Sequence, residues 1–208
     1  MLTHAIEKEI FLVRHGETDY NRSGMVQGRG VDPPLNAEGI RQSQLFFRRY
    51  GSLRFDAVFT SSLLRSRQSM EPFIRQGITW HTSSDLDEIS WGVFEGKPAA
   101  EPFRSAYRQL LAAWKQGQFE AAAPQGESPL QVQQRMEQFR KVLIGSPYQR
   151  VLVCTHGRAM RILLSVWLGT GLERMDDFPH HNFTLYVLCY DGHRFQLRLF
   201  NNRDHLQA

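Results

Sequence analysis

The sequence predicts a single α/β domain of three layers, in which helices flank a mostly parallel central sheet and a terminal hairpin adds an antiparallel edge. Two observations predict this class. Short apolar runs alternate with longer helical segments over residues 9–168, as in parallel strands joined by crossover helices. Two later apolar runs flank Asp191-Gly192, a strong hairpin signal. We expect the domain to span residues 1–208, with a helical cover inserted around residues 97–127.

The expected elements follow one another in a regular order. The strands are short and apolar, and they cover residues 9–14, 55–60, 78–82, 150–155, 184–190 and 195–200. The helices cover residues 36–50, 61–76, 101–115, 128–144 and 157–168. Asn36 and Ser128 are favoured helix caps, and Gly51 is a favoured stop. One apolar face is predicted for the helix over 128–144, formed by Val132, Met136, Phe139 and either Val142 or Leu143.

Composition excludes several classes of protein. The chain has 208 residues, of which 41% are apolar and 22% charged, which is typical of a folded globular domain. The net charge is +4, but the 25 Lys and Arg residues form no continuous block, so nucleic acid is not an expected partner. A membrane partner is not expected either, because no apolar run is long enough to span a bilayer. Cys154 and Cys189 lie in apolar runs, which predicts buried, unpaired thiols and a cytoplasmic location.

The segment Arg14-His15-Gly16 directly follows the first expected strand, at an edge of the sheet where chemistry often occurs. A neutral imidazole can attack phosphorus through one nitrogen if a hydrogen bond fixes the other. The arginine provides a planar fork of donors for phosphate oxygens, and the glycine lets the backbone approach an anion closely. Taken alone, this tripeptide more often means a histidine that simply ends a strand.

Six segments in order change that interpretation. They are residues 12–21 (LVRHGETDYN), 27–39 with Gln27-Gly28, Asp32, Pro34-Leu35 and Gly39, 61–68 (SSLLRSRQ), 86–96 (LDEISWGVFEG), 125–128 (QGES) and 155–157 (THG). Together they resemble the histidine phosphatase superfamily, which contains cofactor-dependent phosphoglycerate mutases and related phosphatases on one α/β fold. The resemblance covers about residues 9–168 and extends through Asn182 and Asn201. Each short motif alone is weak, but the ordered set is specific.

The resemblance implies that His15 is the nucleophile and receives the phosphoryl group. Arg14, Arg65 and His156 are then expected to hold the phosphoryl oxygens, where charge spreads during transfer. Gly157 follows His156 and opens a helix, whose free N–H groups attract an anion. From the residues alone, without the resemblance, Arg65 could equally be a solvated helix residue and His156 could be a core histidine.

Glu88 is the proton donor that the resemblance implies, acting first as acid and later as base. Chemistry alone cannot choose it over Asp85, Asp87 or Glu95, because any of these carboxylates can be ordinary surface charge.

Further contacts with the phosphate or the leaving group are assigned to Asn21 and Gln27 through their side chains and to Gly28 through its backbone. No metal and no cofactor are expected: His180-His181 are adjacent in sequence, so their side chains diverge, and no His-x-x-x-His motif with an acid is present.

Within the family, the sequence favours a phosphatase. Mutases resemble longer chains with an arginine-rich insertion after the glutamate motif, whereas residues 97–124 contain only four cations. A cofactor-dependent phosphoglycerate mutase and a non-catalytic phospho-ligand binding domain are the alternatives. The expected substrate is a small phosphorylated metabolite, with phosphosugars, phosphoserine, α-ribazole phosphate, phosphoglycerates and phosphoproteins as candidates. The exposed edge of the terminal hairpin could support a homodimer.

Overall fold

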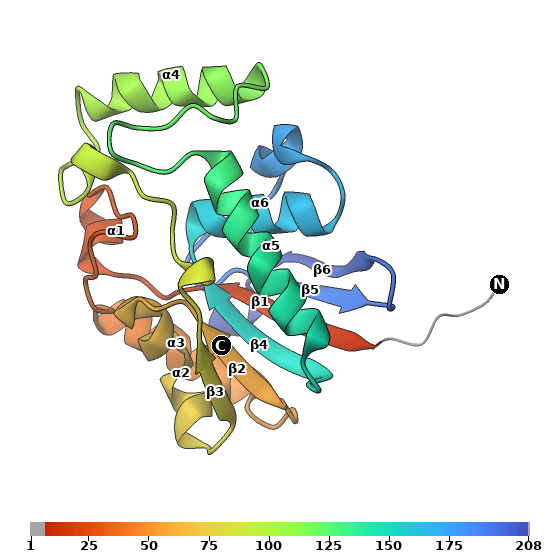
Figure 1. The fold of residues 1–208 in the computed structure, drawn as a ribbon. Helices are drawn as coiled ribbons and strands as arrows, with labels where there is room; N and C mark the ends of the chain where they lie inside the picture. Colours follow the sequence, from red (N-terminus) through yellow and green to blue (C-terminus); the bar gives the residue numbers. More distant parts are fainter. Residues whose placement is uncertain (1–6, 208) are drawn as a thin grey trace.

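A central sheet organises the protein, and the computed structural model describes residues 7–207 (Figure 1). Within these residues, the strand order is β3-β2-β4-β1-β5-β6. The strands are β1 (Lys8–Arg14), β2 (Ala57–Thr60), β3 (Thr79–Thr82), β4 (Arg150–Thr155), β5 (Leu185–Tyr190) and β6 (Phe195–Asn202). β1 to β4 are parallel, and β5 and β6 add antiparallel partners at one side. The predicted fold class, a mostly parallel sheet with a terminal antiparallel hairpin, is confirmed.

Helices cover both faces of the sheet. They are α1 (Asp19–Ser23), α2 (Ala37–Tyr50), α3 (Leu64–Arg75), α4 (Phe103–Lys115), α5 (Pro129–Gly145) and α6 (Gly157–Trp167), with short 3₁₀ helices η1 (Ser84–Leu86), η2 (Gly92–Phe94), η3 (Leu172–Asp177) and η4 (Asp204–Leu206). Alternate residues of β1 point to opposite faces, so Ile10 and Leu12 pack towards α5 and α6, while Phe11 and Val13 pack towards α2 and α3. The result is the predicted three-layer arrangement with a core on each side of the sheet.

The helix expected at residues 61–76 starts later than its sequence suggests. α3 begins at Leu64, because the two preceding serines are used in tertiary contacts. The Ser61 hydroxyl pairs with His156, and the Ser62 backbone and hydroxyl donate to Asp87. The carboxylate of Asp32 accepts from the Leu64 N–H at 2.8 Å and caps the helix from another segment.

The structure also shows which residue completes the apolar face of α5, and it contains one further helix, α1. On α5, Leu143 is fully buried and Val142 is 61% exposed, which decides between the two alternatives for the apolar face. α1 was not expected from the sequence. It is a single short helix in which Thr18 and Asn21 form a capping box.

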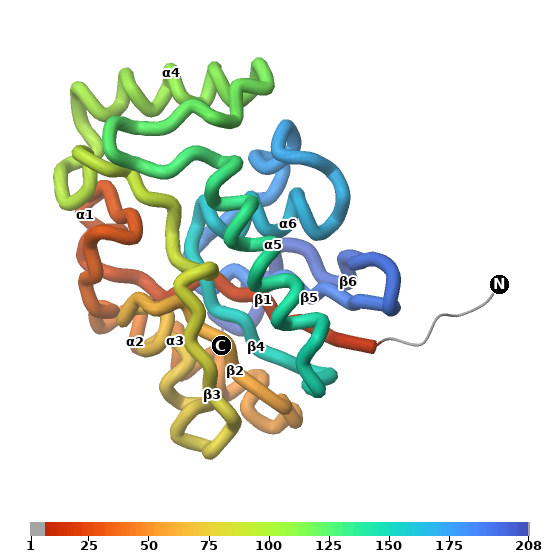
Figure 2. Tube along the Cα trace, viewed as in Figure 1, coloured from red at the N-terminus to blue at the C-terminus, as the bar shows by residue number. Residues whose placement is uncertain are grey.

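α4 and the segment that returns from it to α5 lie apart from the sheet, at the top of the view in Figure 2. Aromatic contacts join this part to the core, since Trp114 is 1% exposed and its ring lies 6.2 Å from that of Trp91. Within residues 7–207, no helix is both long enough and apolar enough to cross a bilayer.

Candidate active site

The two histidine motifs meet at the carboxyl ends of neighbouring strands. β1 and β4 are parallel and paired in register, with Arg14 opposite Thr155. The His15 N–H donates to the Thr155 carbonyl at 3.0 Å. The imidazole rings of His15 and His156 therefore lie with their centroids 4.9 Å apart, although 141 positions separate them in sequence (156 minus 15). Parallel strands bring both motifs to one edge of the sheet, where ligands bind in open α/β folds.

The His15 side chain has a defined tautomer. Its Nδ1 lies 2.7 Å from the Gly16 carbonyl oxygen, which can only accept a hydrogen bond, so Nδ1 carries the proton and Nε2 has a free lone pair. Burial, reinforced by Arg65 and Arg14, holds the pKa of His15 well below its ordinary value. The ring is 1% exposed. His15 is thus a neutral imidazole with one nitrogen ready to act as a nucleophile.

Arg14 precedes His15 in the chain, and part of its guanidinium is unused. Its Nη1 donates to Nδ1 of His180 at 3.3 Å, and its buried Nε has no hydrogen-bond partner within residues 7–207. Burial lowers the pKa of Arg14 to about 10, and Glu88 partly opposes this effect. The group stays charged at neutral pH, so Arg14 offers a buried cationic donor that has no acceptor among residues 7–207.

Arg65 is fully buried, and the loop that precedes α2 surrounds its guanidinium. Nη2 donates to the Gly28 carbonyl at 3.0 Å and Nη1 to the Val31 carbonyl at 2.9 Å, while Nε donates to His156. Burial lowers the pKa of Arg65, and nearby carboxylates, Glu88 first among them, work against this shift. Arg65 therefore contributes a fixed positive charge to the site and anchors the loop at Gly28.

Gly28 itself leaves no room for a side chain. A Cβ at this position would lie 2.8 Å from the Ile89 carbonyl oxygen and would also meet the Glu95 carboxylate, so this close packing requires glycine.

His156 uses both ring nitrogens within the protein. Arg65 Nε can only donate, so Nδ1 of His156 accepts at 3.2 Å and Nε2 donates to the Ser61 hydroxyl at 2.7 Å. Burial, assisted by Arg65, keeps the pKa of His156 well below its ordinary value. In this arrangement the ring orients Arg65, and contact with a phosphoryl oxygen would need a rearranged proton or side chain. Next to it, the ring of His180 lies over Gly157, where a Cβ would approach within 2.9 Å.

The carboxylate of Glu88 lies at the N-terminus of α6. Oε1 accepts from the N–H groups of Ala159 and Ile89, both at 2.9 Å, and Oε2 accepts from Arg158 N–H at 3.1 Å. Two N–H groups at the start of α6, the helix end that we expected to attract an anion, therefore bind this carboxylate. Glu88 is 7% exposed.

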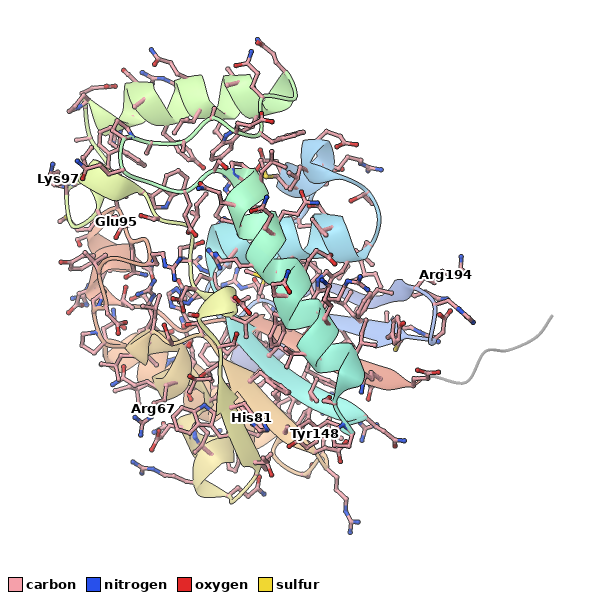
Figure 3. All side chains as sticks on the ribbon, in the orientation of Figure 1. Arg67, His81, Glu95, Lys97, Tyr148 and Arg194 are labelled. Atoms are coloured by element: carbon pink, nitrogen blue, oxygen red, sulfur yellow. The ribbon has the colours of Figure 1, made fainter. Side chains whose placement is uncertain are left out.

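The competing acids have other partners. Asp87 accepts from Ser62 and Arg29, and Glu95, beside η2 (Figure 3), accepts from Ser90 and Trp91. Both carboxylates hold loops in place, whereas Glu88 is the one that reaches α6 next to His156.

Asn21 and Gln27 lie on the α1 side of the site. The Thr18 hydroxyl donates to Gln27 Oε1 at 2.8 Å, and Asn182 Nδ2 donates both to Asn21 Oδ1 at 3.2 Å and to the His15 carbonyl at 3.0 Å. Asn182 thus connects Asn21 to the backbone of His15.

Three contributors to the site had no assigned role from the sequence. They are Ser61, Asn182 and His180, which contact His156, the backbone of His15, and Arg14. The resemblance was expected to extend through Asn182 but gave it no role, and the pair His180-His181 was considered only as a metal ligand.

The buried histidines predict a loss of stability in mild acid. Burial first, and then neighbouring arginines, lower the pKa values of His15, His156 and His180, that of His180 to about 2. In the unfolded chain they take up protons as the pH falls through about 6.5, while the folded chain does not, so their contribution is complete above that pH and is lost below it. We expect the free energy of unfolding, measured with urea, to fall steadily from pH 7 to 5, and less steeply in His180→Gln. An unchanged value between pH 8 and 5 would contradict this.

Comparisons with known proteins identify the family to which the chain belongs. A family model described as histidine phosphatase superfamily (branch 1) matches residues 10–203, so the chain belongs to this superfamily. A candidate phosphoserine phosphatase 2 of Hydrogenobacter thermophilus is 25% identical, covering 95% of this chain and 97% of its own. A candidate phosphoglycerate mutase GpmB of Proteus mirabilis is 34% identical over 77% and 75% of the two chains. The structure of a candidate α-ribazole-5'-P phosphatase of Escherichia coli superimposes with a TM-score of 0.83 at 25% identity, over 94% of this chain and 97% of that one.

These comparisons confirm the resemblance that the sequence motifs indicated. They also confirm the predicted enzyme class, a phosphoric monoester hydrolase of the histidine phosphatase type.

Proposed function

We propose that the chain hydrolyses a small phosphorylated metabolite through a phosphohistidine on Nε2 of His15, without a metal ion. The proposal is carried by two groups that are adjacent in sequence: a histidine with a free ring nitrogen and an arginine with an unpaired donor. The Gly16 carbonyl fixes the proton of His15 on Nδ1, and the buried Nε of Arg14 beside it has no acceptor within residues 7–207. A phosphoryl oxygen would supply that acceptor and bring phosphorus within reach of Nε2.

In the first step, Nε2 of His15 attacks phosphorus in line, and the bond between phosphorus and the leaving oxygen breaks. Protonated Glu88 transfers its proton to that oxygen, so an alcohol leaves and the carboxylate remains. In the second step, water gives a proton to the Glu88 carboxylate and attacks the phosphohistidine. The P–N bond breaks, its electron pair returns to Nε2, and inorganic phosphate is released.

The charges at the site suit a phosphate without a metal. Arg14 and Arg65 together offset the two negative charges of a phosphomonoester dianion, which is the task that a metal ion performs in other phosphoryl-transfer enzymes. In the described part of the chain, no three His, Cys, Asp or Glu side chains converge in a way that could hold a metal ion.

Contacts in the cover favour hydrolysis over the mutase alternative. Arg104 donates to the Ala99 carbonyl, and Arg108, which is 69% exposed, pairs with Glu101. Both arginines have their partners within their own segment, which argues against their serving as the cations that a phosphoglycerate would need for its carboxylate and second phosphate.

Phosphate release from a panel of phosphomonoesters in excess EDTA tests this function. The panel contains phosphoserine, α-ribazole phosphate, a phosphosugar and 3-phosphoglycerate, with and without a bisphosphate primer. We expect release that is unaffected by EDTA and needs no primer. Interconversion of phosphoglycerates that depends on a primer, without net release, would instead support a mutase, and binding without turnover would support a binding domain.

We also propose a cytoplasmic location, with neither nucleic acid nor membrane as a partner. The location is supported by the two cysteines. Cys154 and Cys189 are buried and unpaired, and burial raises the pKa of both thiols, so neither is placed to form a disulfide at the surface.

A further inference from the structure

The acid of the proposed mechanism lies on an irregular segment. Glu88 follows η1 and precedes η2, so no helix or strand holds its backbone in place. General acid catalysis requires the carboxyl group to stay within hydrogen-bond reach of the leaving oxygen. Some other part of the molecule must therefore fix this segment. Figure 1 shows that it runs alongside the first turns of α5, and η1 packs against that helix.

Arg135 of α5 binds three of the four backbone carbonyls of residues 85–88, and the Thr155 hydroxyl binds the fourth, that of Leu86. Nη1 donates to the carbonyls of Asp85 and Asp87, each at 2.7 Å, and Nη2 donates to the carbonyl of Glu88 itself at 3.2 Å. Nε and Nη2 also form a bidentate pair with the Glu127 carboxylate, both at 3.1 Å. The five N–H donors of one guanidinium thus meet five acceptors, a match that only the arginine fork provides.

Glu127 and Arg29 extend this arrangement to the rest of the segment. The Glu127 carboxylate also accepts from Ser90 N–H at 2.9 Å and from Arg29 at 3.0 Å, while Arg29 reaches Asp87 at 3.3 Å. Burial works to raise the pKa of Glu127, but Arg135 and the other donors outweigh it and keep this pKa below its ordinary value. The side chain of Arg135 is 11% exposed and that of Glu127 16%, so solvent weakens their pairing little.

We propose that Arg135 is the positioning residue for Glu88: it clamps the backbone of residues 85–88 so that the carboxylate reaches the N-terminus of α6 beside His156. This inference rests on the proposed function. Arg135 lies 47 positions from Glu88 in sequence, and it holds the proton donor close to the place of the leaving oxygen. A displacement of about 1 Å at such a group can cost about 100-fold in rate.

The test compares two esters with Arg135→Gln. An alkyl phosphate has a basic leaving oxygen that needs the proton of Glu88, whereas p-nitrophenyl phosphate has a weakly basic one that hardly does. We expect kcat/KM to fall about 10- to 100-fold for the alkyl ester and less than about threefold for the aryl ester. In a Glu88→Gln background, the same substitution should cost no more than about twofold, because its effect passes through Glu88.

Arg140→Gln is the matched control, since Arg140 lies on the same helix and pairs with Glu137. If Arg135→Gln fails to fold, Glu127→Gln, which keeps the guanidinium and weakens its anchor, should show the same selective loss on a smaller scale.

The other outcomes overturn the inference in distinguishable ways. Equal losses with both esters, or an undiminished loss in the Glu88→Gln background, would show that Arg135 serves only stability. No loss with either ester would show that Glu88 needs no such clamp. A wild-type chain that releases phosphate from neither ester contradicts the proposed function itself, and the inference falls with it.

Discussion

Replacing His15 with alanine is expected to lower phosphate release by about 10⁴-fold or more, because the variant has no nucleophile to accept the phosphoryl group. Arg14 and Arg65 remain in place, since their charges do not depend on the imidazole, so inorganic phosphate should still bind. The measurement is steady-state phosphate release together with a phosphate affinity for both proteins. Loss of turnover with retained binding would separate the covalent step from the binding step.

His81→Ala provides the control for losing an imidazole elsewhere. His81 lies on the edge strand β3, stacked on Phe59 and bonded to Tyr148 (Figure 3). Its removal should leave kcat/KM within about twofold, because β2 and β4 lie between β3 and the strand that leads to His15. If His15→Ala kept more than a few per cent of wild-type activity, another group would have to be the nucleophile.

The second large effect is expected for Glu88→Gln, which keeps the shape of the side chain but removes its proton transfer. General acid and base catalysis contributes about 10²- to 10⁴-fold, so kcat/KM for an alkyl phosphate should fall within that range. The loss with p-nitrophenyl phosphate should be smaller, because its leaving group needs little help. Hydrolysis of the phosphohistidine should also slow, since water is no longer deprotonated. Rapid mixing with the aryl ester should then show a burst of p-nitrophenol close to the enzyme concentration.

Glu95→Gln is the control for Glu88. Its carboxylate holds Ser90 and Trp91, so we expect lower thermal stability but an unchanged ratio of activities towards the two esters. If Glu95→Gln gave the selective loss and Glu88→Gln did not, the two acids would have to exchange roles.

The sequence predicted the parts of the site that depend on local pattern. The strands that carry His15 and His156 were recognisable as apolar runs, and parallel pairing alone brings their carboxyl ends together. The tautomer of His15 is also local in origin, because its Nδ1 binds the carbonyl of the very next residue.

Long-range contacts could not be predicted from the sequence. Nothing local distinguishes Glu88 from Asp87, because the difference lies in the N–H groups of α6, which meet Glu88 from 70 and 71 positions away. His180 reaches Arg14 across 166 positions. The late start of α3 has the same cause, since Ser61 and Ser62 find partners outside the helix that they were expected to begin. Each outcome was decided by polar groups that are satisfied only in the folded chain.

Trapping the covalent intermediate tests the phosphohistidine mechanism most directly. Glu88→Gln would be mixed with a ³²P-labelled phosphomonoester in EDTA, quenched in base within milliseconds, and digested to locate the label. We expect about one phosphoryl group per chain, attached to Nε2 of His15, in a form that is stable in base and labile in acid. A label on another residue, or steady phosphate release with no labelled protein at any time, would contradict it.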